Sequence, residues 1–294
     1  MTDNKLHWHW TCNNKIFFNK FNAITENLET NLPIHFVPQQ DILTKNFATQ
    51  SNLSWDQVLA HRVRNLREQH KYIKVWFSGG IDSKKMLTAF LDNNIFIDEI
   101  VCVKSGIHTA DYEINDIALP YLKEHQHRFK KTKIKIITPT INDYRKIFSN
   151  PNWMEDFVNL DAWHFRLNSY FENLEYKTYD CANIMGKEKP LLIFKDNEWW
   201  ITWLDLRINP AQISKDIKIN FYDDDTDIIK HQSHSLKNYI VNNFNKEDYN
   251  SICFYQSSNQ KHLNVGCGRL NKVEEDFILK SFSKDDKFMD YKNK

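Results

Sequence analysis

The segment Ser78-Gly79-Gly80-Ile81-Asp82-Ser83 restricts the fold of this chain more than any other. The residues just before it, 71–77 (KYIKVWF), are apolar, aromatic or β-branched, which is typical of a buried strand. The residues after it, 81–94, carry apolar side chains at helical spacing. The segment therefore predicts a sharp turn that joins the end of a buried strand to the start of a helix.

Strand and helix patterns alternate along the chain around this turn. Further strands are predicted at 97–104, 133–139 and 179–185, and further helices at 55–70, 111–131, 153–175 and 225–244. A hairpin is predicted over 191–205, with its turn at Asp196-Asn197. Strands and helices in this order favour right-handed crossovers and an α/β fold with a doubly wound, mostly parallel sheet.

These patterns predict that the chain divides into three parts. Residues 1–70 form an N-terminal extension, with a strand over 7–10, a short helix over 15–29 and a helix that begins after the N-cap Ser54. Residues 71–195 form the core. Residues 196–294 form a hairpin and helical C-terminal part that packs on the core, so helical additions are expected at both ends.

Composition excludes several classes of protein. Lys and Arg total 39 against 38 Asp and Glu, a net charge of +1, so a strongly basic nucleic-acid-binding surface over the whole molecule is not expected. Apolar runs stay well short of the roughly 20 residues that span a bilayer, and the N-terminus lacks a secretory pattern. The 5 cysteines are scattered, without a CxxC pair. A reducing, cytoplasmic location without membrane attachment is expected.

The residue types in the turn suit a phosphate group. Gly79 and Gly80 let the backbone turn sharply and approach an anion, and the amides and dipole of a helix start favour negative charge. Ser78 and Ser83 add hydroxyl donors. Asp82 suits Mg²⁺ rather than phosphate itself. Lys84 or Lys85 is placed to offset the charge of a departing pyrophosphate. The alternative is a Gly-Gly turn that binds nothing.

This segment differs from the GxxxxGK[ST] and GxGxxG loops and resembles the SGGxDS motif of the N-type PP-loop ATP pyrophosphatases. The superfamily, also called adenine nucleotide alpha-hydrolase-like or HUP, includes the synthetase domains of asparagine, GMP and NAD synthetases. The resemblance covers about residues 71–105. It implies that ATP, with Mg²⁺, transfers AMP to a carboxylate, carbonyl or amide oxygen and releases pyrophosphate. A nitrogen or sulfur nucleophile then attacks the adenylate.

The resemblance also implies a set of site residues. The nucleotide-binding residues expected from it are Trp76, Phe77, Ser78, Gly79, Gly80, Ile81, Asp82, Ser83 and Val103. A second polar segment, Gly186-Lys187-Glu188-Lys189-Pro190, resembles the loop that closes on the phosphates in related enzymes. Gly186, Lys187 and Lys189 are therefore added to the nucleotide site, although a solvated basic turn is an equal alternative. Asp82, Lys84 and Lys187 are the expected catalytic residues, and Asp82 the expected metal ligand.

The segments LREQHKYIKVWFSGGIDS, GKEKP and FYDDDTDIIKHQSH together are similar to uncharacterised bacteriophage PP-loop proteins, which would place the chain in a host cytoplasm. Position 2 is Thr2, not the N-terminal nucleophile Cys of glutamine-dependent enzymes. Cys253 and Cys267 are too few for the zinc cluster of the deazaguanine synthases. Ammonia or an amine is therefore expected from solution or from a partner, the alternative being a separate ammonia or sulfur donor protein. The acceptor stays open between a small molecule, a nucleobase and a tRNA base.

Other features leave alternatives open. Cys267 is faintly similar to the catalytic cysteine of phosphoadenylyl-sulfate reductases, which keeps a sulfur enzyme as an alternative beside a nucleotide sensor without catalysis. The pairs His7/His9 and His231/His234 are read as surface residues rather than metal ligands. The acidic run Asp223–Asp225 is read as a helix cap rather than a second Mg²⁺ site. Basic side chains before the first core strand face either RNA or solvent; they are Arg62, Arg64, Arg67, His70, Lys71 and Lys74.

Overall fold

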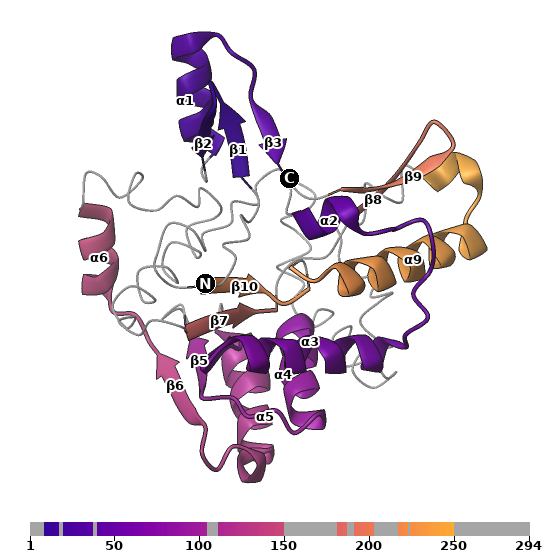
Figure 1. Cartoon of the computed structure of the whole chain (residues 1–294). Helices are drawn as coiled ribbons and strands as arrows, with labels where there is room; N and C mark the ends of the chain where they lie inside the picture. The colour runs from indigo at the N-terminus through magenta and orange to yellow at the C-terminus, as the bar shows by residue number, and fades with distance from the viewer. Residues whose placement is uncertain are drawn as a thin grey trace, which may run out of the picture. The chain divides into compact units, whose positions relative to one another are not determined.

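The computed structural model of the chain divides into two compact units, residues 1–190 with 202–231, and residues 191–201 with 232–294 (Figure 1). The structure describes residues 9–17, 20–37, 40–104, 111–149, 181–186, 191–202, 217–222 and 224–249. No helix within those ranges is both long and apolar enough to cross a membrane.

The first unit contains a five-stranded parallel sheet in the order β10-β7-β4-β5-β6. Its strands are β4 (Tyr72–Trp76), β5 (Glu99–Val103), β6 (Lys133–Ile137), β7 (Cys181–Met185) and β10 (Ile217–Asn220). The predicted α/β fold with a parallel sheet is confirmed. Strand β10 was not predicted, and it comes from beyond residue 195, in the part expected to be a C-terminal addition.

Helices α3 (Trp55–Gln69) and α4 (Ile81–Asp92), the π-helix η1 (Glu113–Ala118) and α5 (Leu119–Glu124) pack on one face of this sheet (Figure 1). Alternate strand residues such as Ile73, Val75, Ile100 and Ile184 point into that core and are fully buried. Helix α3 begins at the predicted cap: Ser54 and Gln57 form a reciprocal capping box. The segment predicted to be helical over 111–131, before and after Pro120, contains η1, α5 and the short η2 (Gln126–Arg128).

The opposite face of the sheet carries charge at its centre. Lys74 on β4 and Glu99 on β5 form an ion pair of 3.1 Å, with side chains only 5% and 4% exposed. The hydroxyl of Tyr72 donates to Glu99 over 3.2 Å. Burial, together with the Glu99 carboxylate, raises the pKa of Tyr72 to about 12, so this hydroxyl keeps its proton at neutral pH. Because both side chains are buried, the Lys74–Glu99 ion pair lies inside the fold rather than on its surface.

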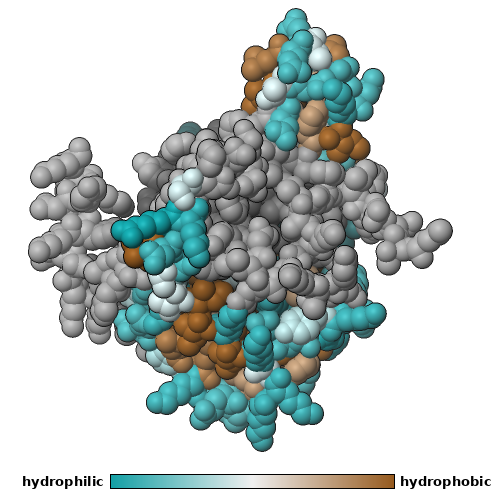
Figure 2. Space-filling model, turned by 90° about the vertical axis from the view of Figure 1, so that its left-hand side faces the viewer, coloured by the Kyte–Doolittle hydropathy of each residue, from teal (hydrophilic) through white to brown (hydrophobic). Residues whose placement is uncertain are grey.

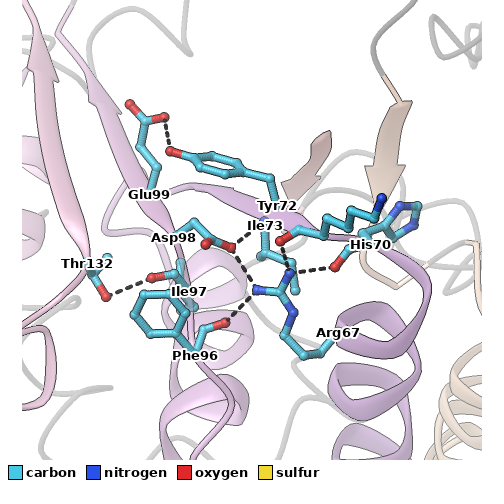
Figure 3. Close-up of polar contacts among 10 residues, drawn as sticks. Arg67, His70, Tyr72, Ile73, Phe96, Ile97, Asp98, Glu99 and Thr132 are labelled. Atoms are coloured by element: carbon cyan, nitrogen blue, oxygen red, sulfur yellow. Dashed lines mark hydrogen bonds and ion pairs between the residues drawn. The ribbon is translucent and has the colours of Figure 1, made fainter. Parts of the chain in front are cut away.

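A polar network ties the amino ends of β4 and β5 to the end of α3 (Figure 3). Arg67 forms an ion pair of 2.7 Å with Asp98 and also donates to the main-chain oxygens of His70, Lys71 and Phe96. Asp98 in turn accepts the amide of Ile73 over 2.8 Å. This network lies at the end of the strands opposite to the glycine turn, and it uses Arg67 internally rather than for an external partner.

Strand β6 forms one edge of the sheet and is partly apolar. Ile134 and Ile136 are 41% and 47% exposed, and hydrophobic side chains gather on the lower part of the face seen in Figure 2. Lys133 and Lys135 alternate with these isoleucines. Charged side chains on an edge strand discourage pairing with another sheet.

The N-terminal part of the first unit is a small antiparallel sheet with one helix. It comprises β1 (His9–Cys12), β2 (Lys15–Phe17), α1 (Lys20–Thr30) and β3 (His35–Val37), in the order β2-β1-β3. The helix predicted over 15–29 is thus wrong at its start. Asn13 and Asn14 have φ values of 51° and 59°, so they form a two-residue hairpin turn and the chain continues as a strand.

Short helices α2 (Gln40–Thr44) and α6 (Ile141–Ser149) were not predicted. Helix α9 (Thr226–Asn243) runs through both units. In the second unit, β8 (Leu191–Lys195) and β9 (Glu198–Thr202) form the predicted hairpin, and Asp196 and Asn197 have the positive φ values of its turn. Its apolar residues pack with the second half of α9 and with Tyr249, after η4 (Lys246–Asp248).

Candidate functional site

The glycine turn lies at the point where the sheet reverses direction. From β4 the chain proceeds outward through β5 to β6, and then returns to β7 on the other side of β4 before reaching β10. Ligands of open α/β sheets bind outside the carboxyl ends of the strands at such a reversal. The ends of β4 and β7 meet there, because Trp76 pairs with Met185. The turn that follows β4 and the Gly186 that follows β7 therefore lie at the same edge.

Gly79 is the residue that makes the turn. Its φ of +86° is a conformation that residues with a side chain rarely adopt. A methyl carbon built on Gly79 would lie 2.5 Å from the main-chain oxygen of Glu113 and 2.8 Å from the amide nitrogen of Ala118. Those two atoms belong to the first and last residues of η1, so the turn packs directly on the π-helix. The predicted sharp turn is confirmed, and the helix it packs on explains why Gly is needed.

The serine hydroxyls hold the turn together. The Ser78 hydroxyl accepts the Gly80 amide over 3.3 Å and lies 3.0 Å from the Ser83 hydroxyl. Ser83 donates to the main-chain oxygen of Gly80 over 3.0 Å and is buried. Both hydroxyls were predicted as donors to a ligand. The structure shows them bonding within the turn, with only Ser78 exposed.

Helix α4 begins without a side-chain cap. Gly80 is its N-cap residue, with φ −63°, and because it has no side chain it makes no side-chain cap hydrogen bond. Helix α3 has a full capping box, and α9 is capped by Asp225, whose carboxylate accepts the amides of Asp227 and Ile228. The amides at a helix start can bind an anion, which the helix dipole also favours. This start of α4, with Asp82 in its first turn, fits a phosphate group and its Mg²⁺.

Two residues distant in sequence brace this helix start. A methyl carbon on Gly186 would lie 2.8 Å from Cα and 2.9 Å from the amide nitrogen of Ser83, so the end of β7 touches the first turn of α4. The buried Tyr222, just after β10, donates its hydroxyl to the main-chain oxygen of Asp82 over 2.8 Å. The contact of Gly186 with Ser83 leaves no room for a larger residue at position 186.

Removing the Tyr222 hydroxyl is expected to loosen the start of α4. In Tyr222→Phe the Asp82 oxygen loses a buried donor, and one such bond contributes about 0.5–1.5 kcal/mol to stability. Urea unfolding should show a loss of that size with an unchanged m-value. A stability equal to wild type would mean that the oxygen finds another donor and that Tyr222 does not brace the turn.

The other predicted residues fall into two groups. Trp76 and Val103 lie in a small apolar cluster with Val101, Met185 and Ile137 at the carboxyl ends of the strands, where adenine was expected. Phe77 does not line this cluster. Its side chain is 1% exposed and packs in the opposite core, 5.8 Å from the Tyr121 ring. Adjacent strand residues point to opposite faces, so Trp76 and Phe77 cannot both face a ligand.

Lys84 is directed at an aromatic ring. Its ammonium lies 5.3 Å from the centre of the Tyr121 ring, on α5. Ile81 is half-buried as the first residue of α4. Lys187, Lys189, Cys267, Asp223 and His7 lie outside the described residues. Among the residues that the structure describes, no group of three His, Cys, Asp or Glu side chains could hold a metal by itself.

The acidic run and the basic residues have mostly internal partners. Asp224 accepts the amide of Asn220, and Asp225 caps α9, so the predicted cap is confirmed for Asp225. Arg62 is buried, donates to the Phe221 oxygen over 3.2 Å and lies 3.8 Å from Asp225. His231 packs against the ring of Trp55. With Arg67 and Lys74 also paired inside the fold, these side chains do not form an open basic surface.

The described cysteines are poorly suited to sulfur chemistry. Cys12, Cys102 and Cys181 are all buried thiols. Burial raises the pKa of the Cys102 thiol to about 12, which keeps it protonated and unreactive at neutral pH.

Sequence reasoning missed Glu113 and Tyr222. Glu113 is the first residue of η1, and a methyl carbon on Gly80 would lie 3.5 Å from its Oε2 atom. No local sequence signal marks Tyr222, whereas an acidic side chain at the start of the helix after the second strand was a usable signal for Glu113. Comparison with protein-family models and with curated proteins gives no match to this chain.

Proposed function

We propose that this chain is an ATP pyrophosphatase of the PP-loop type, with the HUP variant of the α/β fold. The observation that carries the proposal is the turn at residues 78–83. It joins a buried strand to a helix start whose N-cap residue is a glycine, at the reversal point of a parallel sheet. Motif, main-chain conformation and position in the sheet all favour the phosphates of a nucleotide at one place.

The described residues have distinct parts in this proposal. The amides at the start of α4 bind the phosphates, and the apolar cluster of Trp76 and Val103 provides a surface for adenine. Asp82 holds Mg²⁺, which neutralises charge on the phosphates when bound. An acceptor oxygen attacks the α-phosphorus, the bond to the bridging oxygen of the β-phosphate breaks, and pyrophosphate leaves. Tyr222 and Gly186 keep the first turn of α4 in place during this step.

The same proposal includes the acceptor, which it specifies only by chemical class. A carboxylate, carbonyl or amide oxygen on a small molecule, a nucleobase or a tRNA base fits the chemistry, with ammonia or sulfur supplied by a separate protein. The proposed setting is the cytoplasm, which for a bacteriophage protein is that of the infected host. No described residue favours the sulfur-reductase alternative.

The products of ATP cleavage test the proposal. With water as a slow acceptor, wild type should convert ATP to AMP and pyrophosphate in a Mg²⁺-dependent reaction. Asp82→Ala should lower the rate by at least about 100-fold, or 2.7 kcal/mol, because it removes a ligand of the metal. Chromatography of labelled nucleotides measures both products.

The matched control is Asp92→Ala, at the far end of α4, where the carboxylate is 63% exposed and lies 3.5 Å from Arg128. It should cleave ATP at the wild-type rate. ADP and phosphate as the products of the wild type, or full activity in Asp82→Ala, would rule the proposal out.

A further inference from the structure

Glu113 places a second carboxylate beside the turn. Its Oε2 atom lies 3.5 Å from where a methyl carbon on Gly80 would be, and the Ser78 hydroxyl lies 3.4 Å from the same point. Asp82 is two residues further along, in the first turn of α4. Both acidic residues thus flank the helix start, although one comes from α4 and the other from η1.

The π-helix fixes the main chain of Glu113 against the turn. The Glu113 oxygen and the Ala118 nitrogen are both within 3 Å of the position of a Gly79 methyl carbon. Such a close approach leaves little freedom for the first residue of η1 to move away from the glycines. π-Helical turns are rare and occur frequently at functional sites.

Two carboxylates beside this helix start conflict with a bound triphosphate unless a cation lies between them. Like charges in a site that excludes water repel strongly. Mg²⁺ resolves such a conflict, because it is bound in proteins by one or two carboxylates together with substrate phosphates. The acidic residues and the phosphate-binding amides of α4 therefore have complementary roles toward one ligand.

We propose that Glu113 is a second carboxylate ligand of the nucleotide-bound Mg²⁺, together with Asp82. This inference rests on the proposed function, since it takes a magnesium–nucleotide complex as the ligand. It assigns to the π-helix the role of holding one metal ligand at a constant position relative to Gly79 and Gly80. Asp82 alone was expected to bind the metal from the sequence.

The probe is α,β-methylene-ATP, which cannot be cleaved between its α- and β-phosphorus atoms. Its binding is measured by calorimetric titration with and without MgCl₂. Mg²⁺ should tighten binding to the wild type. Glu113→Gln keeps the shape of the side chain and removes its charge, so it should lose at least about tenfold of that Mg²⁺-dependent tightening. Binding without metal should stay within about threefold of wild type or become tighter, because a repulsive charge is gone.

Asp116→Asn is the matched control, on the same π-helix but exposed to solvent; it should bind as wild type does. Urea unfolding of each variant establishes that it is folded. An unchanged Mg²⁺ dependence in Glu113→Gln overturns the inference and leaves the proposed function standing. The inference is also overturned if Glu113→Gln binds the nucleotide more tightly than wild type by the same factor with and without Mg²⁺, because Glu113 would then only repel the phosphates. A wild type that binds no nucleotide overturns both proposals.

Discussion

Gly79→Ala should destabilise the protein by about 2–5 kcal/mol, the largest loss expected from adding a single methyl group. The left-handed conformation at φ +86° costs a residue with a side chain about 1–2 kcal/mol. The new methyl carbon would also lie 2.5 Å from the main-chain oxygen of Glu113. Because both the turn and η1 are packed in place, relieving this clash would disturb η1. Urea unfolding measures this loss. Binding of α,β-methylene-ATP should weaken by more than about tenfold, because the turn shifts.

The neighbouring glycine provides the control. Gly80 has φ −63°, and a methyl carbon there would be 3.4 Å from the Ser78 hydroxyl and 3.5 Å from the Glu113 carboxylate, which are ordinary contacts. Gly80→Ala should therefore change stability by less than about 1 kcal/mol. Equal losses in the two variants would show that position 79 is not specifically constrained and that the turn has another conformation in solution.

Lys74→Met should lower stability by about 3–5 kcal/mol, because it leaves the Glu99 carboxylate buried without its closest cation. The remaining partners of Glu99 are weaker. Lys133 is 3.5 Å away and 65% exposed, and the Tyr72 hydroxyl carries no charge at neutral pH. Replacing both members of the pair, as Lys74→Met with Glu99→Leu, should recover most of the loss, since an apolar pair of similar volume is often tolerated in such positions.

Urea unfolding of the two single variants and the double variant forms a thermodynamic cycle for the pair. Lys133→Met is the control for removal of a lysine beside Glu99. It should cost less than about 1 kcal/mol because an exposed ion pair contributes little. A double variant as unstable as the sum of the single ones would contradict the coupling of Lys74 with Glu99.

Features with a local cause could be predicted from the sequence. Ser54 with Gln57 marks the start of α3, Asp196-Asn197 marks a hairpin, and the glycine turn marks the boundary of β4 and α4. Features that depend on distant partners could not. Strand β10 is short and polar in part, and it becomes a strand through its pairing with β7. The π-helix likewise packs against Gly79, a distant contact that its own residues do not reveal.

The candidate site divides in the same way. Its turn is formed by consecutive residues, so it could be recognised from the sequence alone. Glu113 and Tyr222 reach it only through the folded topology, so neither could be assigned from spacing along the chain. Phe77 is the opposite case: the alternation of side chains in a strand, applied to Trp76 and Phe77 together, was enough to place Phe77 in the core.

The Tyr222 hydrogen bond spans 140 residues of chain, and this separation bears on the order of events during synthesis. A ribosome has produced β4, the turn and α4 long before residue 222 emerges, so the emerging chain has the strand–turn–helix unit without its final brace. Contacts between such distant segments form slowly, because closing long loops costs entropy. The brace on this turn is therefore expected to form late, after β7 and β10 have joined the sheet.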